Sequence, residues 1–173
     1  MENEKIYVFD AYGTLFDVDH ACKKMAIKLG DNWEKLSSIW RQKQLEYSWL
    51  HNSMNEYDTF WKITKDSLEY AMNSLSMNSV KNSKFDELIS EVISVDECKK
   101  FKPHRDVYNL VIDKFNINKK NCIFFSSNCW DIHGASNFGF QTVWVNRKKN
   151  IDELLPGKVD DQVQSLKEYF FKV

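Results

Sequence analysis

The amino-acid sequence predicts an α/β protein, with a parallel sheet flanked by helices and a helical insertion after the first strand. Short apolar runs typical of buried strands alternate with longer stretches whose apolar residues recur at helical spacing. Polar side chains follow directly after several of these runs. Strand and helix alternation favours a parallel sheet, because parallel neighbours are joined through a crossover that is usually a helix.

Four apolar runs are expected to form strands because they are short and bounded by polar or turn residues. They are Ile6–Phe9, Leu88–Val95, Cys122–Phe125 and Thr142–Val145.

Helical spacing is clearest in two stretches that come straight after the first strand, Ile39–Met54 and Tyr57–Leu75. Residues 21–79 are therefore predicted to be a helical cap insertion, with 1–20 and 80–173 forming the α/β core. The Ser- and Asn-rich segment 74–84 is expected to be a loop. Beyond Lys102 we expect one amphipathic helix before the next strand, and a short helix closed by Gly139 after it.

Composition narrows the class of ligand. The chain has 173 residues, with 24 basic and 25 acidic side chains and a net charge of −1, so no basic surface for nucleic acid or anionic membrane is expected. A small-molecule substrate is favoured.

No apolar run reaches the roughly 20 residues of a membrane span. The four cysteines lack the close pairs of a zinc site and no signal peptide precedes them, which predicts free thiols in a cytoplasmic protein. The four histidines show no ligand spacing and receive no role.

Candidate site residues stand at the ends of the expected strands. Asp10 ends the first strand, Lys102 follows another, and Ser126 and Asn128 follow a third, with Asp131 three positions further on. Ligands of an open parallel sheet bind outside the carboxyl ends of its strands. A carboxylate, hydroxyl and amide groups and an ammonium are therefore expected to face one crevice.

Four segments resemble L-2-haloacid dehalogenases of the haloacid dehalogenase superfamily. They are "FDAYGTLFD", "WRQKQLEYSWL", "KPHRDVY" and "SSNCWDIHGASNFGFQTVWVNR". The resemblance implies a Rossmann-like core with a helical cap, a homodimer, and hydrolytic dehalogenation of small L-2-haloalkanoic acids without metal or cofactor. It also implies that Asp10 displaces halide from the α-carbon, forming an ester that water cleaves. The alternative is that Asp10 only hydrogen-bonds the amides of the turn that follows it.

The same resemblance assigns the other roles. Lys102 keeps Asp10 ionised and orients the substrate carboxylate, and Asp131 assists the water that opens the ester, unless it is a helix N-cap. Arg41 receives the halide, unless it is a surface residue paired with Glu46 or Asp66. Further residues are expected to hydrogen-bond the nucleophile or to line the substrate pocket, of which Leu45 and Phe60 could instead be plain core, the default for apolar residues at helical spacing. The residues expected to hydrogen-bond the nucleophile are Thr14, Ser126 and Asn128. The residues expected to line the substrate pocket are Tyr12, Leu45, Phe60, Tyr108, Ser127 and Trp130.

The residue types also bear on phosphoryl transfer, the commoner chemistry of the superfamily. A phosphatase of this kind needs a second Asp two positions after the nucleophile, where this chain has Tyr12, and a phenol with its ordinary pKa of about 10 is a poor acid at neutral pH. The loop Ser126–Asn128 lacks the carboxylates that Mg²⁺ prefers. Halide leaves without a proton, so displacement of halide is favoured over phosphatase activity.

The resemblance breaks between the cap and Lys102. In the family, this region contains a core strand that ends in a Ser-Asn-Gly turn, and the turn binds the substrate carboxylate. No Ser-Asn-Gly sequence occurs in this chain. We therefore expect an internal deletion and a shortened or rearranged sheet, in which either Leu88–Val95 pairs with Ile6–Phe9 or a second copy supplies the contact. Losing the carboxylate clamp leaves a second hypothesis open, a degenerate member that serves as a binding or assembly module.

Overall fold

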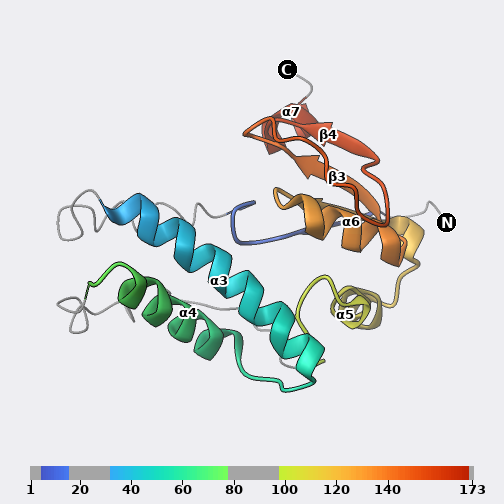
Figure 1. Ribbon diagram of the computed structural model, residues 1–173. Helices are drawn as coiled ribbons and strands as arrows, with labels where there is room; N and C mark the ends of the chain where they lie inside the picture. Colours follow the sequence, from blue (N-terminus) through green and yellow to red (C-terminus); the bar gives the residue numbers. More distant parts are fainter. Residues whose placement is uncertain (1–4, 16–31, 78–97, 172–173) are drawn as a thin grey trace. The chain divides into compact units, whose positions relative to one another are not determined.

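The computed structural model describes residues 5–15, 32–77 and 98–171 of the chain. These residues belong to two compact units (Figure 1). One unit combines Met1–Asp17 with Lys102–Val173, and the other is Val18–Phe101. The domain boundaries expected near residues 20 and 80 lie outside the described residues, so they stay predictions.

A four-stranded parallel sheet forms the centre of the first unit, as far as the described residues go. Its strands stand side by side in chain order, and each pairs in parallel with the next. Phe9 is level with Phe125, and Phe125 with Val143, so the carboxyl ends of the first three strands reach one edge. The strands are β1 (Ile6–Phe9), β2 (Cys122–Ser126), β3 (Gln141–Val145) and β4 (Asp161–Val163).

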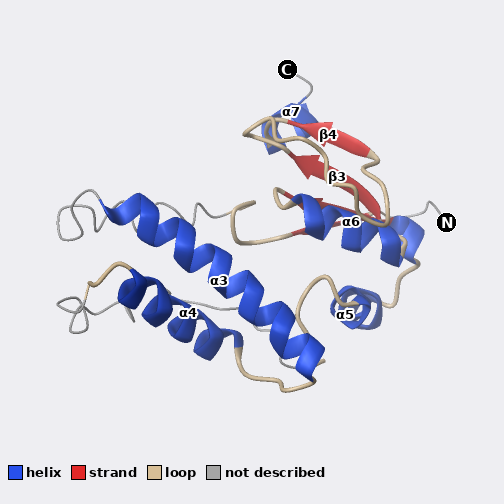
Figure 2. Ribbon diagram, in the orientation of Figure 1, coloured by secondary structure: helices blue, strands red, loops and turns tan. Residues whose placement is uncertain are grey.

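Helices cover both faces of this sheet, as the ribbon coloured by secondary structure shows (Figure 2). Alternate strand residues point to opposite faces. Phe124 and Trp144 pack with α5 (Arg105–Phe115) and α6 (Cys129–Phe138) on one face. Phe125 packs with α7 (Leu166–Phe171) on the other face. Burial from both sides explains why β2 reads as a continuous apolar run.

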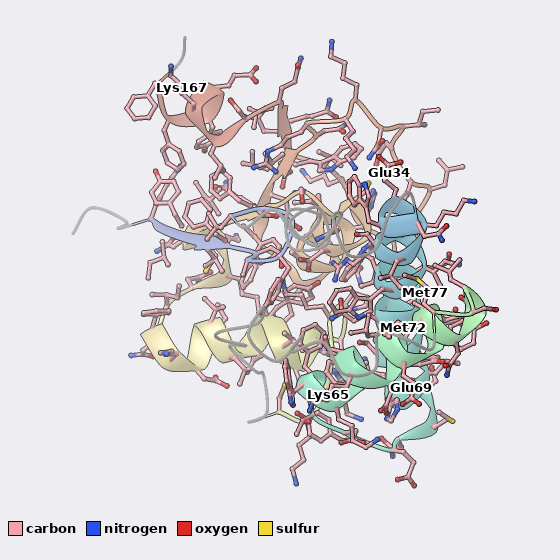
Figure 3. The ribbon with its side chains drawn as sticks, turned by 90° about the vertical axis from the view of Figure 1, so that its left-hand side faces the viewer. Glu34, Lys65, Glu69, Met72, Met77 and Lys167 are labelled. Atoms are coloured by element: carbon pink, nitrogen blue, oxygen red, sulfur yellow. The ribbon has the colours of Figure 1, made fainter. Side chains whose placement is uncertain are left out.

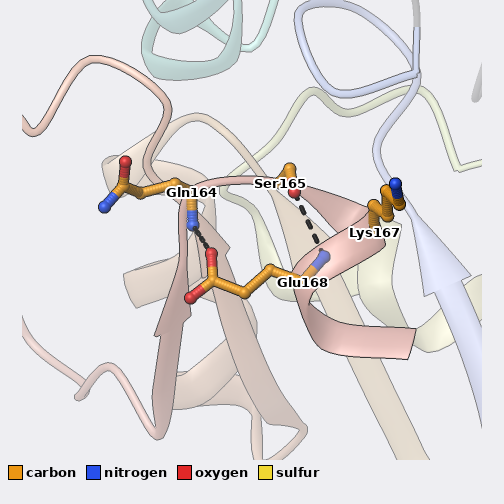
Figure 4. A pocket seen from close by; sticks show the side chains of 4 residues that line it. All are labelled: Gln164, Ser165, Lys167 and Glu168. Atoms are coloured by element: carbon orange, nitrogen blue, oxygen red, sulfur yellow. Dashed lines mark hydrogen bonds between the residues drawn. The ribbon is translucent and has the colours of Figure 1, made fainter. Parts of the chain in front are cut away.

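The helix ends of this unit carry recognisable caps. His104 caps α5 by accepting the backbone N–H of Asp106, and Gly139 ends α6 in the left-handed conformation. At α7 the Glu168 carboxylate accepts the Gln164 N–H, while the Ser165 hydroxyl accepts the Glu168 N–H (Figure 4). Because the carboxylate accepts the N–H of Gln164, the residue before the capping Ser165, this pair is a variant of the capping box, and it supports a helix of only six residues.

The second unit contains a pair of packed helices, α3 (Trp33–Met54) and α4 (Phe60–Ser74). Leu36, Ala71 and Met72 form its buried apolar cluster, and Met77 packs against them (Figure 3). Buried polar contacts reinforce the pair, since Trp40 donates its indole N–H to the Thr64 carbonyl at 2.9 Å. None of the described helices is long and apolar enough to cross a membrane.

The expected strands at 6–9, 122–125 and 142–145 are confirmed to within one residue. The predicted helices are also present, but α3 begins at Trp33 rather than Ile39, and α4 begins at Phe60 rather than Tyr57. The expected strand at 88–95 lies outside the described residues. The sequence interpretation missed β4 and α7, because three and six residues are too few to show a period. Only Val163 of β4 is buried, so the strand has no apolar run.

Candidate active site

Polar side chains gather at the carboxyl edge of the sheet in the first unit. Asp10 follows β1, and its backbone N–H continues the ladder to the Phe125 carbonyl at 2.8 Å. Asn128 follows β2 and is the N-cap of α6. Asp131 lies inside the first turn of that helix, so its expected alternative role as the N-cap is wrong.

The two oxygens of the Asp10 carboxylate have different surroundings. Oδ2 accepts three hydrogen bonds, from the hydroxyls of Thr14 at 3.1 Å and Ser126 at 3.3 Å and from the side-chain amide of Asn128 at 3.0 Å. Oδ1 accepts one, from Nζ of Lys102 at 2.9 Å. These contacts come from side chains, so Asp10 is more than a cap for the amides of its own turn.

Both hydroxyl groups are oriented by backbone donors. The Thr14 hydroxyl accepts the Ser127 N–H at 2.7 Å, and the Ser126 hydroxyl accepts the Asn128 N–H at 3.1 Å. A hydroxyl that accepts from one side is free to turn its proton to the other. The loop after β2 thus directs two protons at Asp10 Oδ2.

Lys102 bridges the carboxylates of Asp10 and Asp131. Its Nζ lies 2.9 Å from Asp10 Oδ1 and 2.9 Å from Asp131 Oδ2. Burial acts to lower the pKa of Lys102, but the two negative charges outweigh burial and raise the pKa above its ordinary value. Lys102 is therefore a permanent cation between two acids.

Asp131 is completely buried. Burial and the neighbouring Asp10 charge raise its pKa, whereas Lys102 and Tyr108 act to lower it. The Tyr108 hydroxyl donates to Asp131 Oδ1 at 2.8 Å, and burial followed by the Asp131 charge raises the pKa of Tyr108. Tyr108 thus stays a neutral donor, and the Asp131 carboxyl group lies between a cation and a phenol.

Arg147 fixes the turn that carries the site. It follows β3, and its two terminal nitrogens donate to the carbonyls of Gly13 at 2.9 Å and Thr14 at 2.7 Å. The sequence interpretation gave Arg147 no role. Its position just after a strand was a usable signal, because the carboxyl ends of parallel strands share one edge.

The structure gathers most of the predicted site residues in the first unit. Tyr12 is half-buried in the turn after β1, and burial raises the pKa of its phenol. Trp130 is half-buried in the first turn of α6. The residues brought together by the contacts above are Asp10, Thr14, Lys102, Tyr108, Ser126, Ser127, Asn128 and Asp131.

Three predicted site residues, Arg41, Leu45 and Phe60, belong to the second unit, and their roles stay predictions. Leu45 and Phe60 are half-buried there. Arg41 donates to Gln44 Oε1 at 2.7 Å, and Gln44 in turn donates to the Thr64 hydroxyl at 2.7 Å. The two acids named as its surface partners have lysine partners, Lys43 for Glu46 and Lys62 for Asp66.

Comparison with known proteins gives a consistent set of relatives. A family model described as haloacid dehalogenase-like hydrolase matches residues 63–145. The (S)-2-haloacid dehalogenase 1 of Pseudomonas sp. (strain CBS-3) is 34% identical over 217 aligned positions, covering 97% of this chain and 96% of the relative. The (S)-2-haloacid dehalogenase 4A of Burkholderia cepacia is 31% identical, covering 93% and 91%.

Solved structures agree with the sequence relatives. A crystal structure described as a dehalogenase superposes with a TM-score of 0.86 at 30% identity, covering 100% of this chain and 98% of that one. The L-2-haloacid dehalogenase from Xanthobacter autotrophicus, with chloropropionic acid covalently bound, superposes with a TM-score of 0.82 at 27% identity, covering 96% of each chain.

The sequence alignment also bears on the expected deletion. Its 217 positions against the Pseudomonas relative exceed the 173 residues of this chain. That relative therefore contains residues that have no counterpart here, which agrees with a chain shortened internally.

Proposed function

This chain belongs to the L-2-haloacid dehalogenases of the haloacid dehalogenase-like hydrolases, and on that premise we propose that it hydrolyses small L-2-haloalkanoic acids through an ester on Asp10. The observation that carries the proposal is the asymmetric environment of the Asp10 carboxylate. The covalent chloropropionic acid in the Xanthobacter relative supports the same chemistry.

Asp10 Oδ1 is the proposed nucleophilic atom. A carboxylate offers about two lone-pair sites on each oxygen. Three donors saturate Oδ2, whereas Lys102 leaves Oδ1 with one free site. The Oδ1 lone pair attacks the α-carbon, the carbon–halogen bond breaks, and halide leaves with the bonding electrons.

The proposed displacement is independent of metal. Lys102 Nζ occupies the position between the carboxylates of Asp10 and Asp131 where a divalent ion would bridge them. Halide leaves without a proton, so the step needs no general acid.

Asp131 is the proposed base for the second half of the reaction. It takes a proton from water as that water attacks the carbonyl carbon of the Asp10 ester, and it returns this proton to the departing alkoxide oxygen, which leaves as the 2-hydroxy acid. The second proton of the water is lost from the Asp10 carboxyl group to solvent, which regenerates Asp10. Lys102 and Tyr108 hold the Asp131 carboxylate in place. Arg41 is the proposed acceptor of the halide, because a guanidinium is always charged and offers several N–H donors.

Halide release tests this proposal. The chain is incubated separately with (S)- and (R)-2-chloropropionate, beside an Asp10→Asn variant and a matched surface control, Asp106→Asn. We expect halide from the (S) substrate, a loss of about 10⁴-fold or more in Asp10→Asn, and no change in the control.

A binding or assembly module is the second candidate function. The module is favoured by the length of the chain, which is shorter than its Pseudomonas relative. The chain also contains no Ser-Asn-Gly sequence, the predicted clamp for the substrate carboxylate. Equal traces of halide from the unmodified chain and from Asp10→Asn would select the module over the enzyme.

A further inference from the structure

A cluster of Cys129, His133 and Asp152 lies in the first unit and takes no part in the proposed dehalogenation. Within the described ranges it is the only group of three such side chains whose ligand atoms all lie within 4.8 Å of one another. Cys129 and His133 are four residues apart on α6, so they share one side of the helix. Both are buried, whereas the Asp152 side chain is 55% exposed.

The loop that carries Asp152 is attached at both of its ends. Near β3, the Asn146 side-chain amide donates to the Asn150 carbonyl at 2.9 Å, and the Asn150 N–H donates back to Asn146 Oδ1 at 2.8 Å. Near β4, the Lys158 N–H donates to the Ser136 hydroxyl of α6 at 3.0 Å. The backbone around Asp152 is thus positioned independently of the cluster itself.

The separations within the cluster are close to those of a metal site. Asp152 Oδ1 lies 3.2 Å from Cys129 Sγ and 2.9 Å from His133 Nε2. A tetrahedral zinc ion with bonds of about 2.0–2.3 Å holds its donor atoms roughly 3.3–3.7 Å apart. An outward shift of the exposed Asp152 carboxylate by less than about 1 Å would bring its two separations into that range, and the remaining pair, Cys129 Sγ and His133 Nε2, lies within 4.8 Å.

We propose that Cys129, His133 and Asp152 bind one zinc ion through sulfur, nitrogen and oxygen. Thiolate and imidazole are ligands that select zinc over the hard cations Mg²⁺ and Ca²⁺. The thiolate and the carboxylate together balance the charge of the ion, and the exposed side of Asp152 leaves the fourth position to water. Binding displaces the thiol proton to solvent as the sulfur–zinc bond forms.

The proposed zinc ion has a structural role. It ties the loop between β3 and β4 to α6, whose N-terminal turn also carries Asn128 and Asp131. Its ligands are distinct from the residues that contact Asp10, so halide displacement does not pass through it.

The alternative is a purely hydrogen-bonded cluster, in which the Cys129 thiol and a His133 N–H both donate to Asp152. Cobalt(II) separates the two, because a cysteine-bound cobalt ion has a thiolate-to-metal charge-transfer absorption and a hydrogen-bonded thiol has none. The reduced, metal-stripped full chain is titrated with Co²⁺ and then with Zn²⁺.

We expect the absorption to saturate at one Co²⁺ per chain and to disappear on addition of Zn²⁺. Cys129→Ser should abolish it, Asp152→Asn should weaken Co²⁺ binding at least about tenfold, and the control Cys98→Ser should leave both unchanged. Asp152 is largely exposed, so its variant remains informative if Cys129→Ser fails to fold. No charge-transfer absorption in the unmodified chain, or unchanged affinity in Asp152→Asn, would overturn the zinc site.

Discussion

Lys102 stands between two carboxylates, and this arrangement decides the charge state of the candidate site. Asp131 is fully buried, a position where an isolated carboxylate would take up a proton. The ammonium 2.9 Å away, together with the Tyr108 hydroxyl, opposes that effect. The site therefore depends on the pairing of one cation, Lys102, with two acids, Asp10 and Asp131.

Lys102→Met should destabilise the fold more at pH 7 than at pH 4.5. Without the ammonium, burial and the neighbouring Asp10 charge raise the folded-state pKa of Asp131 further. When the pKa of a carboxyl group is higher in the folded than in the unfolded protein, the protonated group stabilises the fold. This stabilisation is complete at low pH and is lost as the pH rises through the folded-state pKa. We expect a loss of about 3–5 kcal/mol at pH 7, measured by urea unfolding.

The matched control for that measurement is Lys43→Met, which removes an ion pair with Glu46 at the surface of the second unit. It should change stability little at either pH. An equal loss for Lys102→Met at both pH values would contradict the assigned charges.

Tyr108→Phe should shift the acid limb of the pH profile of halide release to higher pH. The Tyr108 hydrogen bond acts to lower the pKa of Asp131, so its removal raises that pKa further. Asp131 must be ionised to act as a base. In the variant it therefore becomes protonated, and activity falls, at a higher pH than in the unmodified chain. Tyr70→Phe, on the exposed side of α4, is the control, and an unshifted acid limb would argue against Asp131 as the base.

At the element scale, α6 is the helix on which the site depends most. Its N-cap is Asn128, its first turn holds Asp131, and its middle carries Gly134. A Cβ at Gly134 would lie 2.5 Å from the Tyr108 hydroxyl and 2.6 Å from the Pro103 side chain. Glycine here allows α6 to approach the segment that holds Lys102 and Tyr108.

Gly134→Ala should therefore destabilise the protein, although alanine favours a helix over glycine by about 1 kcal/mol. We expect overpacking to dominate, with a net loss of about 1–3 kcal/mol in thermal or urea unfolding. Asn137→Ala, at an exposed position of the same helix, provides the comparison and should change stability little. A Gly134→Ala variant as stable as the unmodified chain would show that the two elements are less tightly packed than described.

The elements that sequence reasoning could predict are those with a clear period or a continuous apolar run. β1, β2 and β3 have such runs, and the polar residues at the ends of β1 and β2 predicted the site. β4 could not be predicted, because a three-residue edge strand with one buried side chain leaves no pattern. The Cys129–His133–Asp152 cluster was missed because its third member comes from a loop, and no sequence period brings that loop to α6.

At the scale of the whole molecule, the shortened chain raises the question of how the sheet is completed at β1. Among the described residues, β1 pairs with β2 on one side and has no other strand partner. The expected repair by residues 88–95 lies outside those residues. Pairing of this edge with a second copy is the other expected repair, and it agrees with the homodimer that the family resemblance implies.

Analytical ultracentrifugation tests the homodimer. We expect a sedimenting species with twice the 20.5 kDa mass of one chain, persisting on dilution through the micromolar range. A species of 20.5 kDa at all concentrations would exclude completion of the sheet by a second copy.

Oxygen-isotope labelling in a single turnover tests whether Asp10 is the nucleophile. Protein in excess over (S)-2-chloropropionate reacts once in water enriched in 18O, and the peptide that contains Asp10 and the released lactate are then weighed by mass spectrometry. If Asp10 forms the ester and water attacks its carbonyl carbon, the heavy oxygen enters Asp10, and the first lactate hydroxyl carries an ordinary oxygen from Asp10. Heavy oxygen in that lactate hydroxyl, with Asp10 unlabelled, would mean that water attacks the substrate directly and that Asp10 is not the nucleophile.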